Sequence, residues 1–199
     1  MTLMVDQLIR KLEHFAPLDP EEKRAVEDAV TGVRRFDAHE DLIHEGDPPE
    51  GVHLILDGFA CRYKLLRDGR RQIVAYLVPG DTCDVRVCLL KRMDHSIGTL
   101  GPVEAALISR QALNELIERY PKITRALWWT TLVEEGITPE WVVNAGNRTA
   151  FDRVSHLFCE LYVRLQAVGL ARAESCDLPL TQHEIGETLA LSTVHVNRT

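Results

Sequence analysis

Four glycine–aspartate turns, evenly spaced through the first half of the chain, limit the possible folds more than any other feature. They are Gly46-Asp47, Asp57-Gly58, Asp68-Gly69 and Gly80-Asp81, at intervals of 11 or 12 residues. Glycine and aspartate are typical of tight turns, because both tolerate backbone conformations that most residues avoid. The short apolar runs between the turns predict strands. Together they predict a small barrel or jelly roll over residues 32–110.

One of these runs has a pattern that indicates how a strand of the roll is exposed. Cys61, Tyr63 and Leu65 alternate with Arg62 and Lys64. Successive side chains of a strand point to opposite faces, so this alternation predicts one apolar face and one face in water.

Helices are expected before the roll, in residues 1–31. Leu8, Ile9 and Leu12 recur at helical spacing. Asp19 is placed to cap a second helix, because Pro20 follows it at the first helical position. We therefore expect two short helices that pack against the roll.

A long helix is expected after the roll, over residues 111–146. Apolar positions follow a 4-3 repeat, which is the spacing of a two-helix seam. The residues predicted to form a dimer interface are Ile123, Leu127, Thr130, Ile137 and Trp141. An alternative is that this face packs on the chain's own roll. Gly136 and Pro139 are expected to kink the helix.

The last residues have the pattern of two short helices joined by a tight turn. Thr181 and Glu184 form a capping box at the start of the first helix, and Ser192 is placed to cap the second. Gly186 would let the two helices cross closely. Residues 147–199 are thus predicted to contain a helix-turn-helix, with an ordinary helical hairpin as the alternative. Because so few residues follow Ser192, we expect the chain to lack its natural end and to bind DNA poorly by itself.

Composition excludes several other classes of protein. The chain has 199 residues, a formal net charge of -7 and five cysteines. The cysteines are scattered and form no Cys-x-x-Cys pair, which favours the reducing cytoplasm and argues against a zinc ribbon. No apolar run approaches the roughly 20 residues that span a bilayer, so no membrane contact is expected. The acidic balance argues against nucleic-acid binding over the whole surface but not against a local site.

At this point the sequence resembles the Crp/Fnr family of bacterial transcription regulators. The segments that carry the resemblance are Glu45-Gly46-Asp47, Leu56-Asp57-Gly58, Pro79-Gly80-Asp81 and Leu180 to Arg198. The resemblance implies an α+β protein: a double-stranded β-helix or jelly roll that senses an effector, a long dimerisation helix and a winged helix-turn-helix, incomplete here. It also implies a homodimer that binds double-stranded DNA.

The effector pocket departs from the pattern of the family's cyclic-nucleotide members. Those members carry a Gly-Glu pair and, farther along the chain, an Arg-Ser or Arg-Thr pair. By resemblance, the corresponding positions of this chain are Asp84-Val85 and His95-Ser96. A neutral imidazole does not replace an arginine fork on a phosphate, so we expect weak or absent binding of cyclic AMP. No cofactor is predicted with certainty. The candidate pocket for another small-molecule effector, with a polar solvated loop as the alternative, comprises Cys83, Asp84, Val85, Arg86, His95 and Ser96.

The resemblance also assigns candidate DNA contacts. It places Thr193, Val194, Asn197 and Arg198 on the base-reading face, and Thr181, His183 and His195 near phosphates. Arginine can pair with guanine, and valine can touch a thymine methyl group. Many relatives have a glutamate where this chain has Val194, so their half-site is not expected to transfer.

Two other functions remain open on the sequence alone. A metal-dependent jelly-roll enzyme of the cupin type needs a His-x-His pair, whereas His53 stands alone on its strand. We therefore expect no enzyme. The other alternative is an effector-binding module that regulates a protein partner without touching DNA. An iron–sulfur sensor is not expected, because no cysteine precedes Cys61.

Overall fold

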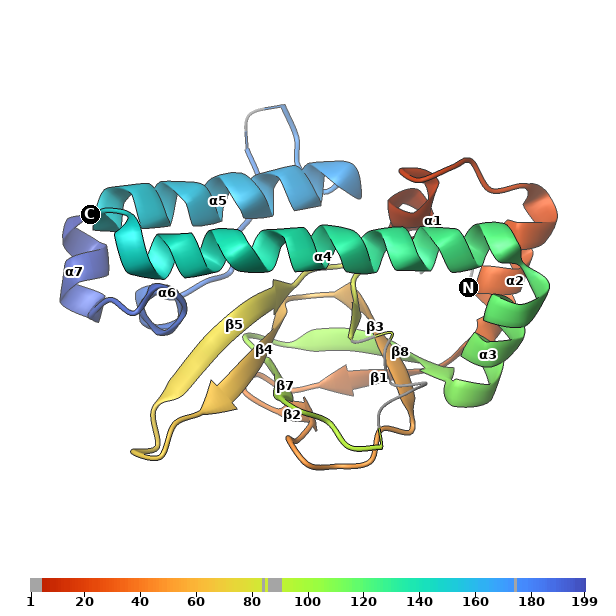
Figure 1. Cartoon of the computed structure of the whole chain (residues 1–199), viewed down its shortest axis with the longest axis horizontal. Helices are drawn as coiled ribbons and strands as arrows, with labels where there is room; N and C mark the ends of the chain where they lie inside the picture. The colour runs from red at the N-terminus through yellow and green to blue at the C-terminus, as the bar shows by residue number, and fades with distance from the viewer. Residues whose placement is uncertain (1–4, 84, 86–90, 174) are drawn as a thin grey trace.

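The computed structural model describes residues 5–83, 85, 91–173 and 175–199. A β-roll forms the body of the molecule, and helices cover one side and both ends of it (Figure 1). The last two helices of the chain lie at one end of the long helix, and the two N-terminal helices lie at the other. Among the helices in these described ranges, none combines the length and apolar character that crossing a bilayer requires.

Two N-terminal helices pack against the roll, as the sequence predicts. They are α1 (Asp6–Glu13) and α2 (Pro20–Ala29). Asp19 caps α2 through backbone N–H groups of its first turn, and Glu22 completes a capping box. Leu8 and Leu12 of α1 are buried. The N-terminal segment is therefore part of the roll's packing.

Two four-stranded antiparallel sheets form the roll. One has the order β1-β8-β3-β6 and the other β2-β7-β4-β5. The strands are β1 (Val30–Phe36), β2 (Asp41–Ile43), β3 (Gly51–Asp57), β4 (Ala60–Leu65), β5 (Arg71–Leu77), β6 (Thr82–Cys83), β7 (Ser96–Thr99) and β8 (Val103–Ser109). All four predicted turn glycines (Gly46, Gly58, Gly69, Gly80) have positive φ. Only glycine adopts that conformation freely, which explains the even punctuation of the sequence.

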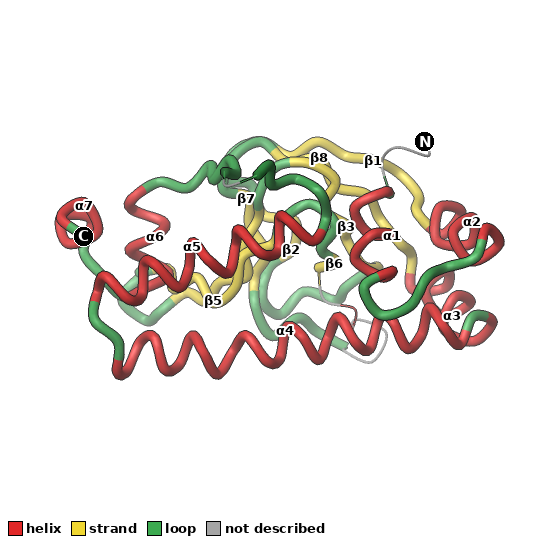
Figure 2. The backbone as a smooth tube through the Cα atoms, turned by 90° about the horizontal axis from the view of Figure 1, so that it is seen from above, coloured by secondary structure: helices red, strands yellow, loops and turns green. Residues whose placement is uncertain are grey.

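Three longer helices follow the roll. They are α3 (Arg110–Arg119), α4 (Pro121–Asn147) and α5 (Ala150–Ala167). α4 continues as one helix through Gly136 and Pro139. Thr149 and Asp152 form the capping box that starts α5. α5 then runs back beside α4, as both views show (Figures 1 and 2).

The chain ends in two short helices, α6 (Gln182–Leu189) and α7 (Thr193–Arg198). The capping box of Thr181 and Glu184 and the Ser192 cap are both present. The predicted fold class, an α+β jelly roll followed by a long helix and a helix-turn-helix, is confirmed. The boundaries proposed between domains stay predictions.

Two separate apolar clusters hold these elements together. We call the first the roll core; its buried members are Val5, Leu8, Ile9, Leu12, Leu18, Val26, Ala29, Phe36, Val52, Leu54, Ile55, Leu56, Ala60, Leu77, Cys83, Met93, Ile97, Val103, Ala105, Ala106, Ile108, Leu113, Leu116, Ile123, Ala126 and Leu127. We call the second the junction core; its buried members are Phe59, Cys61, Tyr63, Ile73, Tyr76, Val78, Leu100, Leu157, Leu161, Leu165, Ile185 and Leu189. The junction core joins the roll to the C-terminal helices.

Candidate functional site

The helix-turn-helix geometry depends on one glycine and one left-handed residue. Ala190, which ends α6, has φ 54°. A Cβ atom on Gly186 would lie 2.6 Å from the carbonyl oxygen of Leu191. Real Cβ atoms do not approach backbone so closely, so the turn between the helices requires glycine at this position. This contact is the physical reason for the glycine expected at position 186.

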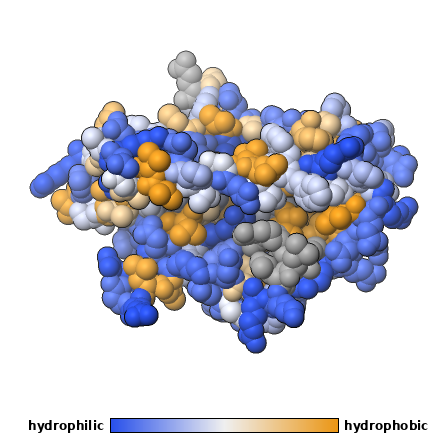
Figure 3. Space-filling model, viewed as in Figure 1, coloured by the Kyte–Doolittle hydropathy of each residue, from blue (hydrophilic) through white to orange (hydrophobic). Residues whose placement is uncertain are grey.

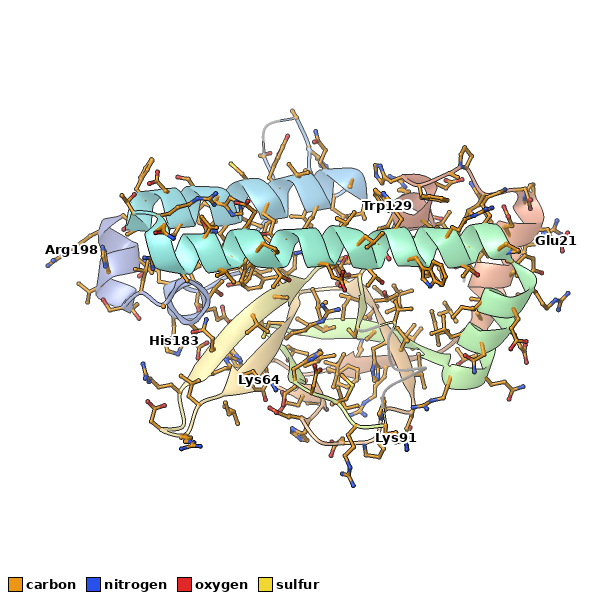
Figure 4. All side chains as sticks on the ribbon, viewed as in Figure 1. Glu21, Lys64, Lys91, Trp129, His183 and Arg198 are labelled. Atoms are coloured by element: carbon orange, nitrogen blue, oxygen red, sulfur yellow. The ribbon has the colours of Figure 1, made fainter. Side chains whose placement is uncertain are left out.

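The second helix, α7, is open to solvent over the face that the sequence singles out. Thr193, Val194, Asn197 and Arg198 are all exposed. Val196 faces the other way and packs against the junction core. Arg198 extends outward at the end of the molecule, and His183 lies at the same end (Figure 4). An exposed helix with an anchored back is the arrangement that enters a DNA groove.

The predicted phosphate contacts differ in their surroundings. His183 and His195 are exposed. The Thr181 hydroxyl accepts from the Glu184 backbone N–H and donates to the Glu184 carboxylate at 2.8 Å. Thr181 is therefore already engaged in capping α6. Its side chain has less freedom to bind a phosphate than the two histidines have.

The first helix, α6, is fixed to the roll by side chains that the sequence analysis did not single out. The Arg71 guanidinium donates twice to one carboxylate oxygen of Glu187, at 3.0 and 2.7 Å. The Gln72 amide donates to the backbone carbonyls of Glu187 and Thr188 at 2.7 and 3.2 Å. These carbonyls belong to the last turn of α6, whose C=O groups lack helical partners. β5 therefore caps the C-terminal end of α6.

A buried hydroxyl pair extends this contact. The Thr188 hydroxyl donates to the Glu184 carbonyl oxygen at 2.8 Å, which leaves its own oxygen to accept from Tyr76 at 2.5 Å. Burial raises the pKa of the Tyr76 phenol, so it keeps its proton and can donate. Burial likewise raises the pKa of the neighbouring Cys61 thiol to about 12. Both groups are neutral parts of the junction core.

A buried carboxylate joins the Gly80-Asp81 turn of the roll to the helices α1 and α5. Asp81 accepts from Lys11 of α1 at 2.8 Å and from Arg164 of α5. Burial by itself would raise the pKa of Asp81, but the charges of Lys11 and Arg164 outweigh it and lower the pKa to about 2. Asp81 is ionised at neutral pH and holds α5 to the turn that it terminates.

The structure corrects the predicted dimer face of α4. Ile123, Leu127 and Thr130 are only 1%, 5% and 3% exposed. The first two lie in the roll core. Trp141 packs against the junction core, and its indole N–H donates to Glu160 of α5 at 2.6 Å. Ile137 is half-buried on the same side. The 4-3 repeat therefore records packing of α4 on its own chain, the alternative considered above.

A second 4-3 series lies on the opposite face of α4. We call it the outer stripe; its members are Trp128, Leu132, Glu135, Pro139 and Val142. The three large apolar side chains of the stripe are exposed: Trp128 by 66%, Leu132 by 64% and Val142 by 68%. Apolar patches run along α4 and α5 on the surface that Figure 3 shows. A row of large exposed apolar side chains on one helix face is a candidate interaction site.

Comparison with known proteins covers both the roll and the C-terminal helices. The cyclic nucleotide-binding domain model matches residues 33–120. The nitrogen fixation regulation protein FixK of Bradyrhizobium diazoefficiens is 29% identical over 98% of this chain and 80% of its own length. The transcriptional activator FnrL of Cereibacter sphaeroides is 26% identical over 96% of this chain and 77% of its own. The structure of FixK2 from Bradyrhizobium japonicum superposes with a TM-score of 0.75, 28% identity and coverage of 85% and 81%.

The chain is therefore similar to bacterial regulators of the Crp/Fnr type in both its roll and its C-terminal helices. Its curated relatives are named as a nitrogen fixation regulation protein and a transcriptional activator, in line with the regulatory role that the resemblance implied. A c-di-GMP-responsive regulator from Xanthomonas campestris also superposes, with a TM-score of 0.70 at 16% identity. That likeness shows the shared fold and nothing about the effector of this chain.

The six residues predicted to form the Crp/Fnr effector pocket lie in different settings. Asp84 and Arg86 fall outside the described residues. Cys83 is buried in the roll core, and Val85 packs against it. The Ser96 hydroxyl accepts the Glu45 backbone N–H at 2.9 Å. His95 is buried, with Nδ1 2.6 Å from the Asp94 carboxylate. The Ser96 hydroxyl is thus already bonded to the backbone, and the His95 ring lies beside a carboxylate.

The lone histidine considered for a cupin site has a structural environment. His53 packs its ring edge-on against Phe36, with centroids 6.2 Å apart. Burial lowers the pKa of His53, with a smaller contribution from Arg34. Within the described part of the chain, no three histidine, cysteine or acidic side chains gather as a metal site would require.

Proposed function

We propose that this chain is a transcription regulator of the Crp/Fnr type that acts as a dimer whose α7 helices read adjacent major grooves of DNA. The observation that carries the proposal is the contrast within α7. Its outward face is exposed, whereas Val196 holds the helix to the junction core. The pair α6 and α7, which we call the reading head, is thus packed against the junction core on one side and exposed on the other.

Within this proposal, three side chains of α7 read bases. Arg198 offers a fork that matches guanine, Asn197 matches adenine, and Val194 offers a methyl contact to thymine. The Gln182 amide donates to the Asn197 side-chain oxygen at 3.1 Å, which orients that amide before DNA arrives. His183 and His195 then contact phosphates and position the head without reading sequence.

We propose further that the two protomers meet along the outer stripe of α4. The stripe spans 15 residues from Trp128 to Val142, about 21 Å of helix. Two such stripes can bury their apolar positions against each other at coiled-coil spacing. Introducing Leu132→Glu should place two like charges in the seam and weaken dimerisation about 100-fold, measured by sedimentation equilibrium.

Val33→Glu is the matched control for that variant, because Val33 is an exposed apolar residue on β1, away from α4. It should leave association unchanged. If Leu132→Glu remains as dimeric as the control, the outer stripe is not the seam.

The proposed effector is a small molecule other than a cyclic nucleotide bound in the usual way. The family's phosphate-binding arginine is replaced by His95, which lies beside the Asp94 carboxylate. That carboxylate disfavours an anionic ligand at this position. Isothermal titration of cyclic AMP at neutral pH should give no binding in the micromolar range, and binding in that range would refute this part of the proposal.

The reading role is tested by selecting duplexes from random DNA with the purified full-length protein and then measuring affinity for the selected sequence. Arg198→Ala should weaken binding by about 1–3 kcal/mol and relax selection at one base pair of each half-site. Arg24→Ala, an exposed residue of α2 at the far end of the molecule, is the control. A failure to enrich any sequence would favour a regulator that acts on a protein partner.

A further inference from the structure

The reading head has few positive charges for holding DNA. Residues 177–199 contain Asp177, Glu184 and Glu187 but only one arginine, Arg198. Phosphate contacts supply much of the affinity of DNA-binding proteins, and they come mostly from arginine and lysine. Within the described chain, the positive charge nearest to the head must therefore come from another element.

The turn between β4 and β5 is one element that carries such charge. Residues 64–71 contain Lys64, Arg67, Arg70 and Arg71 against Asp68 alone. In Figure 1 this turn projects from the roll at the same end of the molecule as α6 and α7. The sensor domain thus presents a basic tip beside an acidic head.

The tip is held in a defined position next to the head. Arg71 and Gln72, at the start of β5, bind the last turn of α6 through the bonds described above. The Glu187 charge is thereby paired with Arg71, which leaves Arg67 and Arg70 farther out on the turn. Both are exposed.

A groove separates the tip from the start of the reading helix. Gly69 and Arg70 line one side of it, and His183, Ser192 and Thr193 line the other. Ser192 and Thr193 begin α7, and this end of a recognition helix approaches the base edges. The basic tip therefore flanks the side of the head on which the phosphates beside the major groove would pass.

We propose that the β4–β5 turn is a second DNA-contact surface, in which Arg67 and Arg70 bind backbone phosphates beside the groove that α7 enters. The inference rests on the proposed reading role of α7 and adds a contact from the sensor domain. Arg67 has no ion-pair partner among the described residues. Arg70 bonds to the Asp68 carboxylate at 2.8 Å, and this exposed pair is weak enough to exchange for a phosphate.

The test is the salt dependence of binding to the duplex selected by the wild-type protein. Each lost phosphate contact makes the slope of log K against log salt shallower by about 0.9. Arg67→Gln with Arg70→Gln removes up to two contacts in each protomer, so the slope of the dimer should become shallower by roughly 3 to 4. The same loss should occur on a scrambled duplex, because phosphates carry no sequence.

Two further variants fix the sign and the location of the effect. Asp68→Asn removes the negative charge of the tip but keeps an oxygen for the Arg70 backbone N–H, which the carboxylate now accepts at 3.1 Å. It should tighten binding about two- to fivefold. Arg24→Gln on α2 removes one positive charge per protomer at the opposite end of the molecule and should leave the slope unchanged. Thermal unfolding confirms that each variant is folded.

The outcomes separate this inference from the proposed function. If the wild-type protein selects DNA and the double tip variant binds it with the wild-type salt slope, the second contact surface is refuted while α7 remains the reader. If the double variant loses slope and still selects the same sequence, the tip binds phosphate. If the wild-type protein selects no DNA, the proposed reading role fails first, and the tip has no DNA to contact.

Discussion

The roll core and the junction core differ in how far apart in the chain their members lie. The roll core is built from residues 5–127, in which strands and their covering helices follow one another closely. The junction core joins residues 59–100 to residues 157–189, and polar bonds from Arg71, Tyr76 and Asp81 surround it. The roll core stabilises the β-roll and its covering helices. The junction core makes the reading head depend on the sensor for its support.

The largest effect is expected in the roll core. Leu54 of β3 is fully buried there, and Leu54→Ala should lower the free energy of unfolding by about 4 kcal/mol through lost burial and a cavity. Native-state hydrogen exchange should accelerate in both the roll and α6, because the head cannot keep its place on an unfolded roll. Slow exchange retained in α6 alone would mean that the head is independent.

The matched change in the junction core is Leu161→Ala, at another fully buried leucine. It should cost about 3 kcal/mol. Here exchange should accelerate in α5 and α6 while the amides of β3 and β8 remain protected. Equal acceleration everywhere would show that the two cores form one cooperative unit and would remove the distinction drawn above.

An intermediate effect is expected from the carboxylate that links the cores. The pKa of Asp81 is lowered from its ordinary 3.8 to about 2. A lowered folded-state pKa stabilises the protein above the unfolded value, so about 2 kcal/mol should be present above pH 4 and disappear as the pH falls from 4 to 2. Urea unfolding across this range should show the loss in the wild type. Asp81→Asn should be less stable at pH 7 and lack that part of the acid dependence.

The smallest effect is expected from a single hydroxyl. Tyr76→Phe removes the bond to Thr188 and should cost about 1 kcal/mol, with faster exchange in α6. Tyr63→Phe is the control, because the Tyr63 hydroxyl donates to Asp41 within the roll. A double-mutant cycle of Tyr76→Phe with Thr188→Val should give a coupling of similar size; no coupling would mean that the bond does not hold the head.

Local features of the fold were predictable from the sequence because each is fixed by neighbouring residues. Turn glycines with positive φ, capping boxes at Asp19, Thr149 and Thr181, and the close approach at Gly186 each involve residues near one another in the chain. Their signals are therefore visible in short stretches. The order of helices, roll, long helix and head followed from them.

The partner of the 4-3 repeat on α4 could not be predicted, because spacing alone does not identify what a helix packs against. A 4-3 repeat indicates that a helix packs against something, and Ile123 and Leu127 pack on the roll. The outer stripe has the same period but includes Glu135 and Pro139, so its apolar signal is weaker. Burial in the structure distinguishes the two series.

Contacts between the roll and the head had no signal in the sequence. Arg71 and Glu187 are an ordinary surface arginine and helix glutamate until folding brings them together. The water-facing side predicted for β4 is likewise partly covered, because Arg62 pairs with Glu134 of α4 at 3.0 Å. Such pairings depend on the whole topology, which no local pattern records.

The cap that β5 places on α6 has a consequence for how such regulators can be recombined. A transplanted segment of residues 150–199 would leave behind Arg71, Gln72 and Tyr76, and the last turn of α6 would face a foreign surface. The reading head therefore cannot be transferred to another protein without losing these contacts. A chimera designed to retain DNA binding should include the β4–β5 hairpin together with residues 150–199.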